Sequence, residues 1–451
     1  MSGGRPAIMG RLERGPTVND IRVTVESLAH GGDGVARLPD GRTVFVPGSC
    51  PADELTVRIT EDRPRYARAS IVSIDTASPD RVDAPCPYYG TCGGCDWQHV
   101  SYAAQLRAKS RALHDALSHI AGLSDPIVDS CIASPDALGY RNRIELSASE
   151  SPSGLVLGFM RHGTADLLPI DDCPLLQGKN RRLPKSLAGA LRFAARRGAN
   201  GITRVTVRVS SSGETAIALW TPPGPLPRAA VSSLVTEATG ARSVTRIIYK
   251  GPIERRAVTH VEALAGPPVW RERLGDDRYV VSAPSFFQVN SKTAGLLRDR
   301  ALAACDADGT MRVGDLYAGV GTFTLPLARA AGEVVAVESS RYALADLRAN
   351  LDAADLDADI VPGDAAHALG ELGHLDAAVI DPPRSGLSDE TMRALVSARI
   401  HRIVYVSCDP ATLARDVRLL GETGYQPLHF TPVDLFPQTH HVETVGVLEL
   451  A

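Results

Sequence analysis

Short stretches in which apolar and polar residues alternate dominate about the first 75 residues of this 451-residue chain. Such alternation is typical of half-buried strands, and Asp40-Gly41 supplies a strong tight-turn signal between two of them. Five stretches fit this pattern: 21–26, 34–38, 43–46, 54–60 and 68–74. Five short strands over this length predict a small OB-like barrel, a fold that often binds RNA.

The remaining pattern predicts two further kinds of domain. Apolar residues recur at helical spacing over 100–123, whereas 126–264 mixes strands with a helix near 183–197, as in an α+β domain. After Gly266-Pro267-Pro268, strands and helices alternate, which predicts a doubly wound parallel sheet. The predicted domains are a barrel at 15–76, a central α+β domain at 77–99 with 125–270, and a Rossmann-like α/β domain at 100–124 with 271–451.

Charge is unevenly distributed along the chain. The net charge of −4 argues against a nucleic-acid partner, but 174–213 carries nine basic residues and no acidic one, whereas 301–400 carries sixteen acidic residues against seven Arg. We therefore expect the central domain to hold a polyanion while the last domain does chemistry. The nine basic residues are Lys179, Arg181, Arg182, Lys185, Arg192, Arg196, Arg197, Arg204 and Arg208.

Eight cysteines and no apolar run long enough for a membrane span predict a cytoplasmic protein with reduced thiols. Cys86, Cys92 and Cys95 form a C-x5-C-x2-C pattern, and Cys173 stands apart in Asp-Asp-Cys-Pro. Four such thiolates suit either a zinc ion or a [4Fe–4S] cluster, and spacing alone does not choose between them. We expect a monomer.

A glycine-containing turn closes a predicted strand and opens a helix at 315–324. Gly319 and Gly321 let the backbone approach a ligand closely, and Glu338, at the end of the next strand, is placed to accept hydrogen bonds from ribose hydroxyls. A dinucleotide fingerprint would have a third glycine where this chain has Thr324. The combination favours an adenosine-type cofactor without pyrophosphate, namely S-adenosylmethionine.

Three later residues are candidates for chemistry. Asp381 follows an apolar strand and is held by Pro382-Pro383, so it is expected to position the substrate base or the cofactor. Cys408, in Ser-Cys-Asp-Pro, is the candidate nucleophile, and Glu443 is the candidate base. A thiolate that adds to a pyrimidine ring and a base that removes the displaced proton together permit alkylation at carbon. Phe287 is expected to hold the flipped base.

Five motifs in order resemble the RNA uracil-C5 (5-methyluridine) methyltransferase family: Phe-Phe-Gln-Val-Asn at 286–290, the glycine turn, Asp-Pro-Pro-Arg at 381–384, Ser-Cys-Asp-Pro at 407–410, and 436–443. The N-terminal barrel resembles that family's TRAM domain. The resemblance implies Cys408 as nucleophile and Glu443 as base. It also implies a cofactor site formed by Gln288, Tyr317, Thr322, Glu338, Asp364 and Asp381, with Thr322 replacing the Asn that relatives often have.

By the same resemblance the four cysteines hold a [4Fe–4S] cluster, with structural zinc as the alternative. The implied reaction is methylation of C5 of one uridine in RNA. Ribosomal RNA (23S) is favoured and transfer RNA comes next.

Two other functions fit parts of the sequence. One is an iron–sulfur RNA-binding or assembly factor whose methyltransferase fold is inactive, although the presence of both Cys408 and Glu443 speaks against it. The other is a nucleotide-dependent oxidoreductase, which the missing third glycine disfavours.

Overall fold

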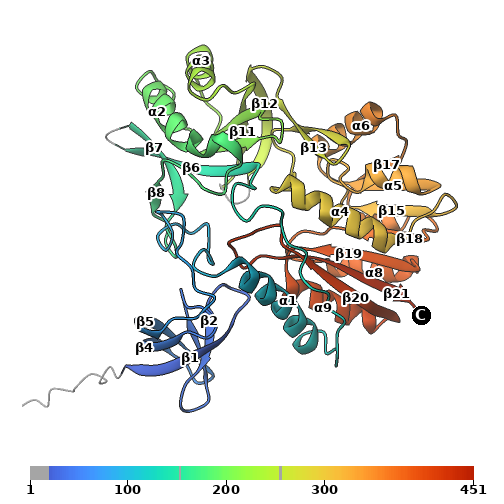
Figure 1. The fold of residues 1–451 in the computed structure, drawn as a ribbon. Coiled ribbons are helices and arrows are strands. Elements are labelled where there is room, and N and C mark those ends of the chain that lie inside the picture. The colour runs from blue at the N-terminus through green and yellow to red at the C-terminus, as the bar shows by residue number, and fades with distance from the viewer. Residues whose placement is uncertain (1–19, 152–153, 253–255) are drawn as a thin grey trace, which may run out of the picture. The chain divides into compact units, whose positions relative to one another are not determined.

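The computed structural model of the chain describes residues 20–151, 154–252 and 256–451 (Figure 1). They belong to two compact units, of which the first ends at Arg81 and the second begins at Val82. The predicted start of the barrel at residue 15 and the side chain of Lys179 lie outside the described residues. Every helix in these ranges is too short or too polar to cross a lipid bilayer.

The first unit is the predicted closed barrel, with strand order β1-β2-β3-β5-β4. Gly41 adopts a φ of +86° in the tight turn between β2 and β3, a conformation that favours glycine. Arg63 and Arg68 of this barrel are paired with Glu61 and Asp33. RNA binding by the barrel therefore stays a prediction. Its strands are β1 (Ile21–Leu28), β2 (Gly34–Arg37), β3 (Thr43–Val46), β4 (Glu54–Asp62) and β5 (Tyr66–Thr76).

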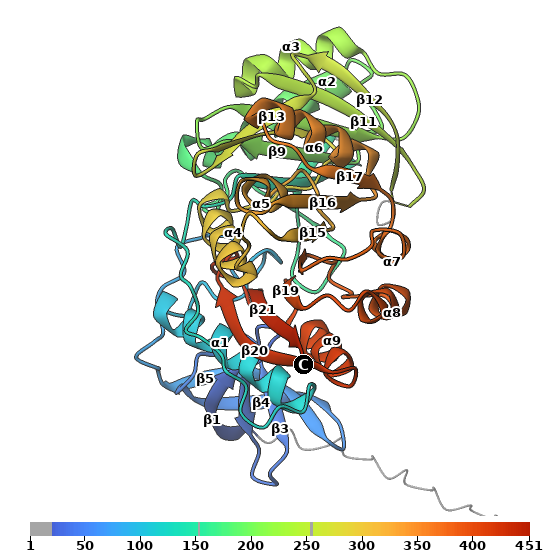
Figure 2. The ribbon, with the colours of Figure 1, turned by 90° about the vertical axis from the view of Figure 1, so that its right-hand side faces the viewer.

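A seven-stranded sheet forms the central part of the second unit, in the order β12-β11-β10-β9-β6-β7-β8. Helices α2 (Leu183–Ala195) and α3 (Arg228–Thr239) pack on one face, where their apolar residues share a core with alternate residues of the strands (Figure 2). The strands are β6 (Arg143–Ser151), β7 (Gly154–Met160), β8 (Leu167–Pro169), β9 (Arg204–Val209), β10 (Thr215–Thr221), β11 (Ser243–Lys250) and β12 (Ala257–Ala265). A 3-10 helix, η1 (Gly178–Arg182), precedes α2, and a hairpin of β13 (Val269–Leu274) and β14 (Asp277–Ser282) follows β12.

A second seven-stranded sheet, in the order β17-β16-β15-β18-β19-β21-β20, carries the C-terminal motifs. The first five strands are parallel, as predicted, but β21 runs antiparallel to both of its neighbours, β19 and β20, so the sheet is mixed. The strands are β15 (Arg312–Leu316), β16 (Glu333–Glu338), β17 (Asp359–Pro362), β18 (Ala377–Ile380), β19 (Arg402–Ser407), β20 (Tyr425–Val433) and β21 (Glu443–Leu450).

Helices cover both faces of this sheet. Strand β19 is apolar along nearly its whole length because Ile403 and Tyr405 enter the core on one face and Val404 enters the core on the other. The helices that flank the strands are α4 (Ser291–Cys305), α5 (Thr324–Ala330), α6 (Arg341–Ala354), α7 (Ala365–Leu369), α8 (Asp389–Ala398) and α9 (Pro410–Gly421).

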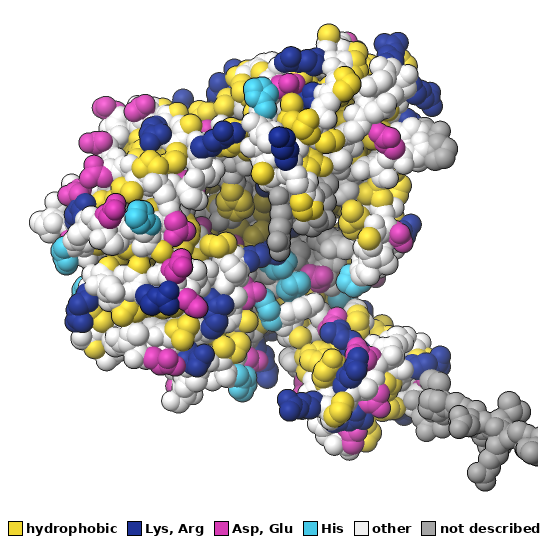
Figure 3. Space-filling view, turned by 180° about the vertical axis from the view of Figure 1, so that it is seen from behind, with side chains coloured by type: hydrophobic (Ala, Val, Ile, Leu, Met, Phe, Trp, Pro, Cys, Tyr) yellow, Lys and Arg dark blue, Asp and Glu magenta, His cyan; other side chains and the backbone are white. Residues whose placement is uncertain are grey.

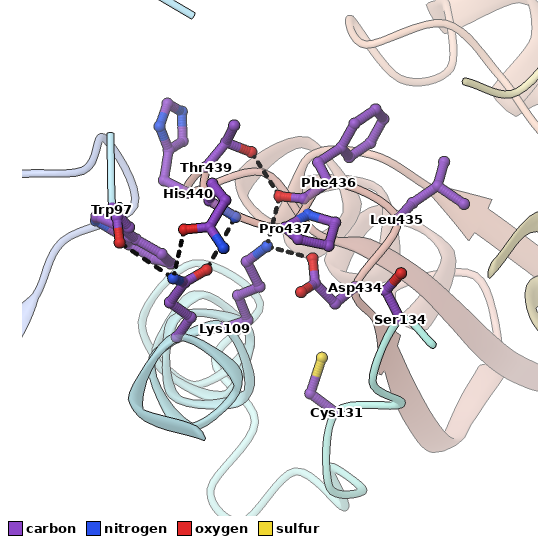
Figure 4. Close-up of polar contacts among 12 residues, drawn as sticks. Trp97, Lys109, Cys131, Ser134, Asp434, Leu435, Phe436, Pro437, Thr439 and His440 are labelled. Atoms are coloured by element: carbon purple, nitrogen blue, oxygen red, sulfur yellow. Dashed lines mark hydrogen bonds and ion pairs between the residues drawn. The ribbon is translucent and has the colours of Figure 1, made fainter. Parts of the chain in front are cut away.

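Helix α1 (Tyr102–His119) packs on α9 and β20 and supports the loop between β20 and β21. Lys109 and Asp434 are both fully buried, and the Lys109 Nζ donates hydrogen bonds to the Asp434 carboxylate at 2.5 Å and to the Phe436 carbonyl at 3.0 Å (Figure 4). Burial lowers the pKa of Lys109, and the Asp434 charge opposes that shift. The pair anchors the start of the loop to α1.

The next residues of this loop are held one by one. The carbonyls of Leu435 and Pro437 accept hydrogen bonds from the Asn290 amide at 3.3 Å and the Tyr140 hydroxyl at 3.0 Å. Gln438 has a φ of +71°, and its N–H donates to the Gln105 side chain at 2.9 Å. A left-handed conformation is costly for a residue other than glycine, so these contacts fix the turn that leads to β21.

We predict that Lys109→Met will lower the free energy of unfolding of this unit by about 3–5 kcal/mol, because it leaves the Asp434 carboxylate buried without a counter-charge. Urea unfolding monitored by tryptophan fluorescence measures the change. Lys185→Met, at an exposed ion pair with Asp171, is the matched control and should leave the midpoint nearly unchanged. Equal midpoints for the two variants would contradict a structural role for the buried pair.

Candidate active site

The predicted site residues follow consecutive strands at one edge of the mixed sheet. Asp364 follows β17, Glu338 ends β16, Tyr317 follows β15, Asp381 follows β18 and Cys408 follows β19. Because these five strands are parallel, their carboxyl ends lie at the same edge, which is where open α/β sheets bind ligands.

The glycine turn is tied to Glu338 as the sequence suggested. The Glu338 carboxylate accepts hydrogen bonds from the backbone N–H of Gly319 at 2.9 Å and of Ser340 at 2.6 Å. A Cβ at Gly319 would meet no atom within 4 Å, whereas a Cβ at Gly321 would lie 2.6 Å from Leu325. Gly319 therefore leaves open space beside the turn, while Gly321 is required for the packing of α5.

Asp315 at the end of β15 was not singled out from the sequence. It is fully buried, and one carboxylate oxygen accepts a hydrogen bond from the Thr324 hydroxyl at 2.5 Å. Its other oxygen has no partner among the described residues. Burial raises the pKa of Asp315 to about 7. Thr324, which stands where a dinucleotide fingerprint would have its third glycine, thus holds the Asp315 carboxylate.

The other predicted cofactor residues differ in their surroundings. Tyr317 is half-buried with a φ of +71°. Gln288 is buried, and its carbonyl accepts a hydrogen bond from the Asn142 side chain at 2.8 Å. Thr322 is half-buried in the glycine turn, and Asp364 is exposed and caps α7 through the N–H of Ala366. Tyr317, Thr322 and Asp364 lie at the sheet edge, and Gln288 lies in the loop before α4.

Cys408 lies in a turn that is closed by local hydrogen bonds. The Ser407 hydroxyl donates to the Asp409 carbonyl at 3.1 Å and accepts from the Asp409 N–H at 3.2 Å. The Asp409 carboxylate then caps α9 by accepting from the N–H groups of Ala411 and Thr412. The half-buried Cys408 is held directly before the start of a helix.

Strand β21 brings Glu443 next to Cys408. It lies between β19 and β20 and pairs antiparallel with β19, with Ser407 opposite Thr444. The residues just beyond this pair are Cys408 and Glu443, so the beginning of β21 lies at the same edge as the end of β19. Glu443 itself is 3% exposed. The structure thus juxtaposes the predicted nucleophile and the predicted base.

The charges at this edge influence one another. Burial and the Asp381 charge raise the pKa of Glu443 to about 8, and the positive charge of Arg384 opposes this shift. Burial and the Glu443 carboxylate raise the pKa of Cys408 to about 11, and Arg384 opposes this shift as well. Arg384 is therefore the cation that favours both charged forms, a role that its place in Asp-Pro-Pro-Arg did not reveal.

The two adjacent phenylalanines at 286 and 287 differ sharply in exposure. Phe287 is 2% exposed and packs edge-on against Trp270 at 5.6 Å between ring centroids, so the expectation that it holds a base is wrong. Phe286 is 62% exposed. The sequence did not distinguish the buried from the exposed phenylalanine, because the two residues are adjacent and of the same type.

The four predicted metal-binding cysteines line one small cavity, together with apolar residues that include Phe159 and Ile170. Hydrogen bonds from Gly93 N–H to the Met160 carbonyl and from His162 N–H to the Thr91 carbonyl hold the cysteine loop against the end of β7. Within the described ranges, no three Cys, His or acidic side chains are arranged to hold a single metal ion. The cysteines are Cys86, Cys92, Cys95 and Cys173.

The basic segment does not form one surface. Arg192 lies on α2, on the helical side of the central sheet, whereas Arg204 and Arg208 lie on β9. Arg181 and Lys185 are paired with Asp172 and Asp171. The prediction that 174–213 acts as a single polyanion-binding segment is therefore too simple, because the sheet separates its two halves.

Two family models match the chain. Residues 17–72 match the TRAM domain, and residues 372–450 match "tRNA (Uracil-5-)-methyltransferase". A protein of Gloeobacter violaceus described as an uncharacterized RNA methyltransferase is 34% identical, with 99% of each chain covered. Another, from Halalkalibacterium halodurans, is 32% identical over 96% of this chain and 97% of its own.

A solved structure also resembles the whole chain. The Pyrococcus abyssi tRNA (uracil-54, C5)-methyltransferase in complex with S-adenosyl-L-homocysteine matches with a TM-score of 0.72 and 26% identity, covering 95% of this chain and 100% of that one. These likenesses agree with the TRAM barrel, the glycine turn and the strand ends at Asp381 and Cys408. The chain therefore belongs to the RNA (uracil-5-)-methyltransferase family, whose members depend on S-adenosylmethionine.

Proposed function

We propose that the enzyme methylates C5 of a uridine in RNA through a covalent bond between Cys408 and C6 of the base, with Glu443 as the base that removes the C5 proton. The observation that carries this proposal is the antiparallel pairing of β21 with β19, which places the two side chains at one end of adjacent strands. This chemistry requires the nucleophile and the base to reach neighbouring carbon atoms of the same pyrimidine ring.

The proposed sequence of steps begins when the target uridine leaves its stack, for which the exposed Phe286 offers an aromatic surface. The Cys408 thiolate, favoured by Arg384, adds to C6 and raises the electron density at C5. S-adenosylmethionine supplies the electrophilic methyl group that C5 then takes up. Glu443 accepts the C5 proton, and the Cys408 sulfur leaves C6 as the ring double bond re-forms.

The residues at the sheet edge fit the cofactor. Gly319 leaves open space beside the turn, and Glu338 follows on the neighbouring strand, where it can also meet ribose hydroxyls. The unpartnered oxygen of Asp315 is a buried acceptor suited to an ammonium group such as that of the methionine part. We propose that these residues act with Gln288, Tyr317, Thr322, Asp364 and Asp381 in binding S-adenosylmethionine.

We further propose that Cys86, Cys92, Cys95 and Cys173 hold a [4Fe–4S] cluster. Four thiols around one cavity are the donors that such a cluster requires, and structural zinc is the alternative for the same donors. Burial raises the pKa of Cys95 to about 12, so the free thiol would stay protonated. Arg141, whose pKa is raised by Tyr140, Cys95 and Cys173 against the effect of burial, is a counter-charge for the thiolates.

The RNA target is proposed on narrower grounds. A TRAM domain together with a cysteine cluster favours ribosomal RNA (23S), although the Pyrococcus abyssi neighbour acts on tRNA. We retain a cytoplasmic monomer as the expectation. Mapping 5-methyluridine in the ribosomal and transfer RNA of cells with and without the gene distinguishes the two targets. Labelled S-adenosylmethionine with bulk RNA separates a methyltransferase from an inactive RNA-binding factor.

We predict that Cys408→Ala will abolish methyl transfer but keep S-adenosylhomocysteine binding. Glu443→Gln should lower turnover by about 10²–10⁴-fold and trap a protein–RNA adduct, because elimination needs the C5 proton to leave. A slow band on a denaturing gel reports the adduct. Cys131→Ala, at another half-buried thiol, is the control for loss of a sulfur. Normal methylation by Cys408→Ala would refute the nucleophile.

A second prediction concerns pH. Glu443 is ionised only above its pKa of about 8, and its negative charge then raises the pKa of Cys408. Glu443→Gln removes that charge, so alkylation of Cys408 by iodoacetamide should begin at lower pH in the variant. The two proteins should react alike below pH about 8 and diverge above it. Mass spectrometry of the Cys408 peptide measures the rates, and superimposable profiles up to pH about 10 would contradict the coupling.

A third prediction concerns the cysteine cavity. Protein purified without oxygen should contain iron and acid-labile sulfide, and Cys95→Ser should lose both while Cys131→Ala keeps them. Because Asp96 and Trp97 donate backbone hydrogen bonds at 3.0 Å to the Gln438 carbonyl, Cys95→Ser should also increase hydrogen exchange in the loop before β21. Zinc in place of iron in the anaerobic protein would overturn the cluster assignment.

A further inference from the structure

The uncovered face of the central sheet carries a group of arginines drawn from distant parts of the chain. In the register between β6 and β9, Arg143 lies opposite Arg208 and Ser147 lies opposite Arg204. The intervening residues, such as Ile144 and Val207, enter the core under α2 and α3. Side chains alternate between the two faces of a sheet, so the arginines lie on the face that the helices leave uncovered.

These arginines carry more positive charge than the described residues around them balance. Glu145 receives ion pairs from Arg143 at 2.7 Å, from Arg256 at 3.4 Å and from Arg204. One carboxylate thus serves three guanidinium groups, and Arg208 adds a fourth. Four guanidinium groups beside one carboxylate leave an excess of three positive charges among the described residues.

Several guanidinium nitrogens in the group are buried without a hydrogen-bond partner in the described ranges. They include Nε and Nη1 of Arg208, which is only 3% exposed. Burial and the charge of Arg143 lower the pKa of Arg208 to about 9. Buried donors are normally satisfied, so this group is suited to receive an anion with several acceptor oxygens.

Aromatic rings hold the guanidinium groups in place. Arg256 lies 4.4 Å from the ring centroid of Trp220, and Arg208 lies 5.3 Å from that of Trp270. The indole N–H of Trp220 in turn donates to the Thr206 hydroxyl at 2.9 Å. Stacked guanidinium groups keep their planar donor edges oriented, which suits them to bidentate phosphate contacts.

The group adjoins the loop that carries Phe286 and Gln288. Arg208 donates a hydrogen bond to the Ser285 carbonyl, directly before the exposed Phe286. Asn142, the residue before Arg143, donates to the Gln288 carbonyl. In the view of Figure 3 the surface is hollowed, with Lys and Arg side chains along the upper edge of the hollow.

We propose that the partly exposed Arg143, Arg204 and Arg256 form a binding site for backbone phosphates of the RNA substrate, on the nucleotides next to the uridine that enters the active site, and that the buried Arg208 adds its positive charge from beneath. The inference rests on the proposed function for the identity of that uridine. It assigns the RNA contact to the uncovered face of the central sheet rather than to the basic residues of α2.

The test compares RNA binding by Arg204→Gln and Arg256→Gln, two partly exposed positions, with binding by Arg192→Gln on α2 and Arg196→Gln at its C-terminal end. The probe is a fluorescent, mixed-sequence single-stranded RNA, titrated at several salt concentrations. Each lost phosphate contact should reduce the slope of log affinity against log salt by about 0.7. The Arg204 and Arg256 variants should show this loss, and the α2 variants should keep the full slope.

Glu145→Gln provides a change of opposite sign. Removal of the Glu145 carboxylate, which pairs with three of these arginines among the described residues, should raise RNA affinity and steepen the salt dependence. Unchanged slopes in the Arg204 and Arg256 variants, or a loss confined to the α2 variants, would overturn the proposal.

Two further measurements separate this inference from the proposed function. All variants should bind S-adenosylhomocysteine with unchanged affinity, and the arginine variants should raise the KM for RNA while kcat at saturating RNA is retained. Absence of methylation in the unmodified enzyme would count against the proposed function, whereas the binding slopes would still decide on the phosphate site.

Discussion

The antiparallel insertion of β21 between β19 and β20 is the constraint on which the catalytic edge depends. The parallel strands alone bring Asp381 and Cys408 to the same edge, since each follows a strand at its carboxyl end. Glu443 stands at the beginning of its strand, and it reaches that edge only because β21 runs in the opposite direction. If β21 ran parallel to β19, its first residue, Glu443, would lie at the opposite end of the strands, away from Cys408.

The electrostatics of the edge follow from this arrangement. Two carboxylates, Asp381 and Glu443, share the neighbourhood of one thiol and of one guanidinium group, that of Arg384. Burial disfavours every ionised form there, so each negative charge makes the next harder to produce. The acid and the thiol at this site therefore hold their protons more tightly than exposed groups would. The positive charge of Arg384 opposes this effect at both Cys408 and Glu443.

The elements formed by local pattern were predictable from the sequence. The barrel strands, the alternation of strands and helices after Gly266 and the turn at Gly319 all carry their signal within a few residues. What could not be predicted depends on distant pairs: Lys109 meets Asp434 across 325 positions, and the order of β20 and β21 is set by packing.

The candidate site shows the same division. Cys408 and Glu443 were predicted from their motifs and lie at the same sheet edge, whereas Asp315 and Arg384 were not predicted, because their surroundings depend on burial and on neighbours that the sequence does not reveal. Phe286 and Phe287 show how a correct motif still leaves the choice between inside and outside open.

The peptide units of Asp96 and Trp97 link two regions that the chain separates by more than three hundred residues. They come directly after Cys95, and both N–H groups donate to the Gln438 carbonyl, while the Asp96 carboxylate also contacts the His440 ring at 2.7 Å. The thiol cavity and the approach to β21 thus share a single short span of backbone. A displacement of Cys95 would therefore be transmitted through this span to the loop that leads to Glu443.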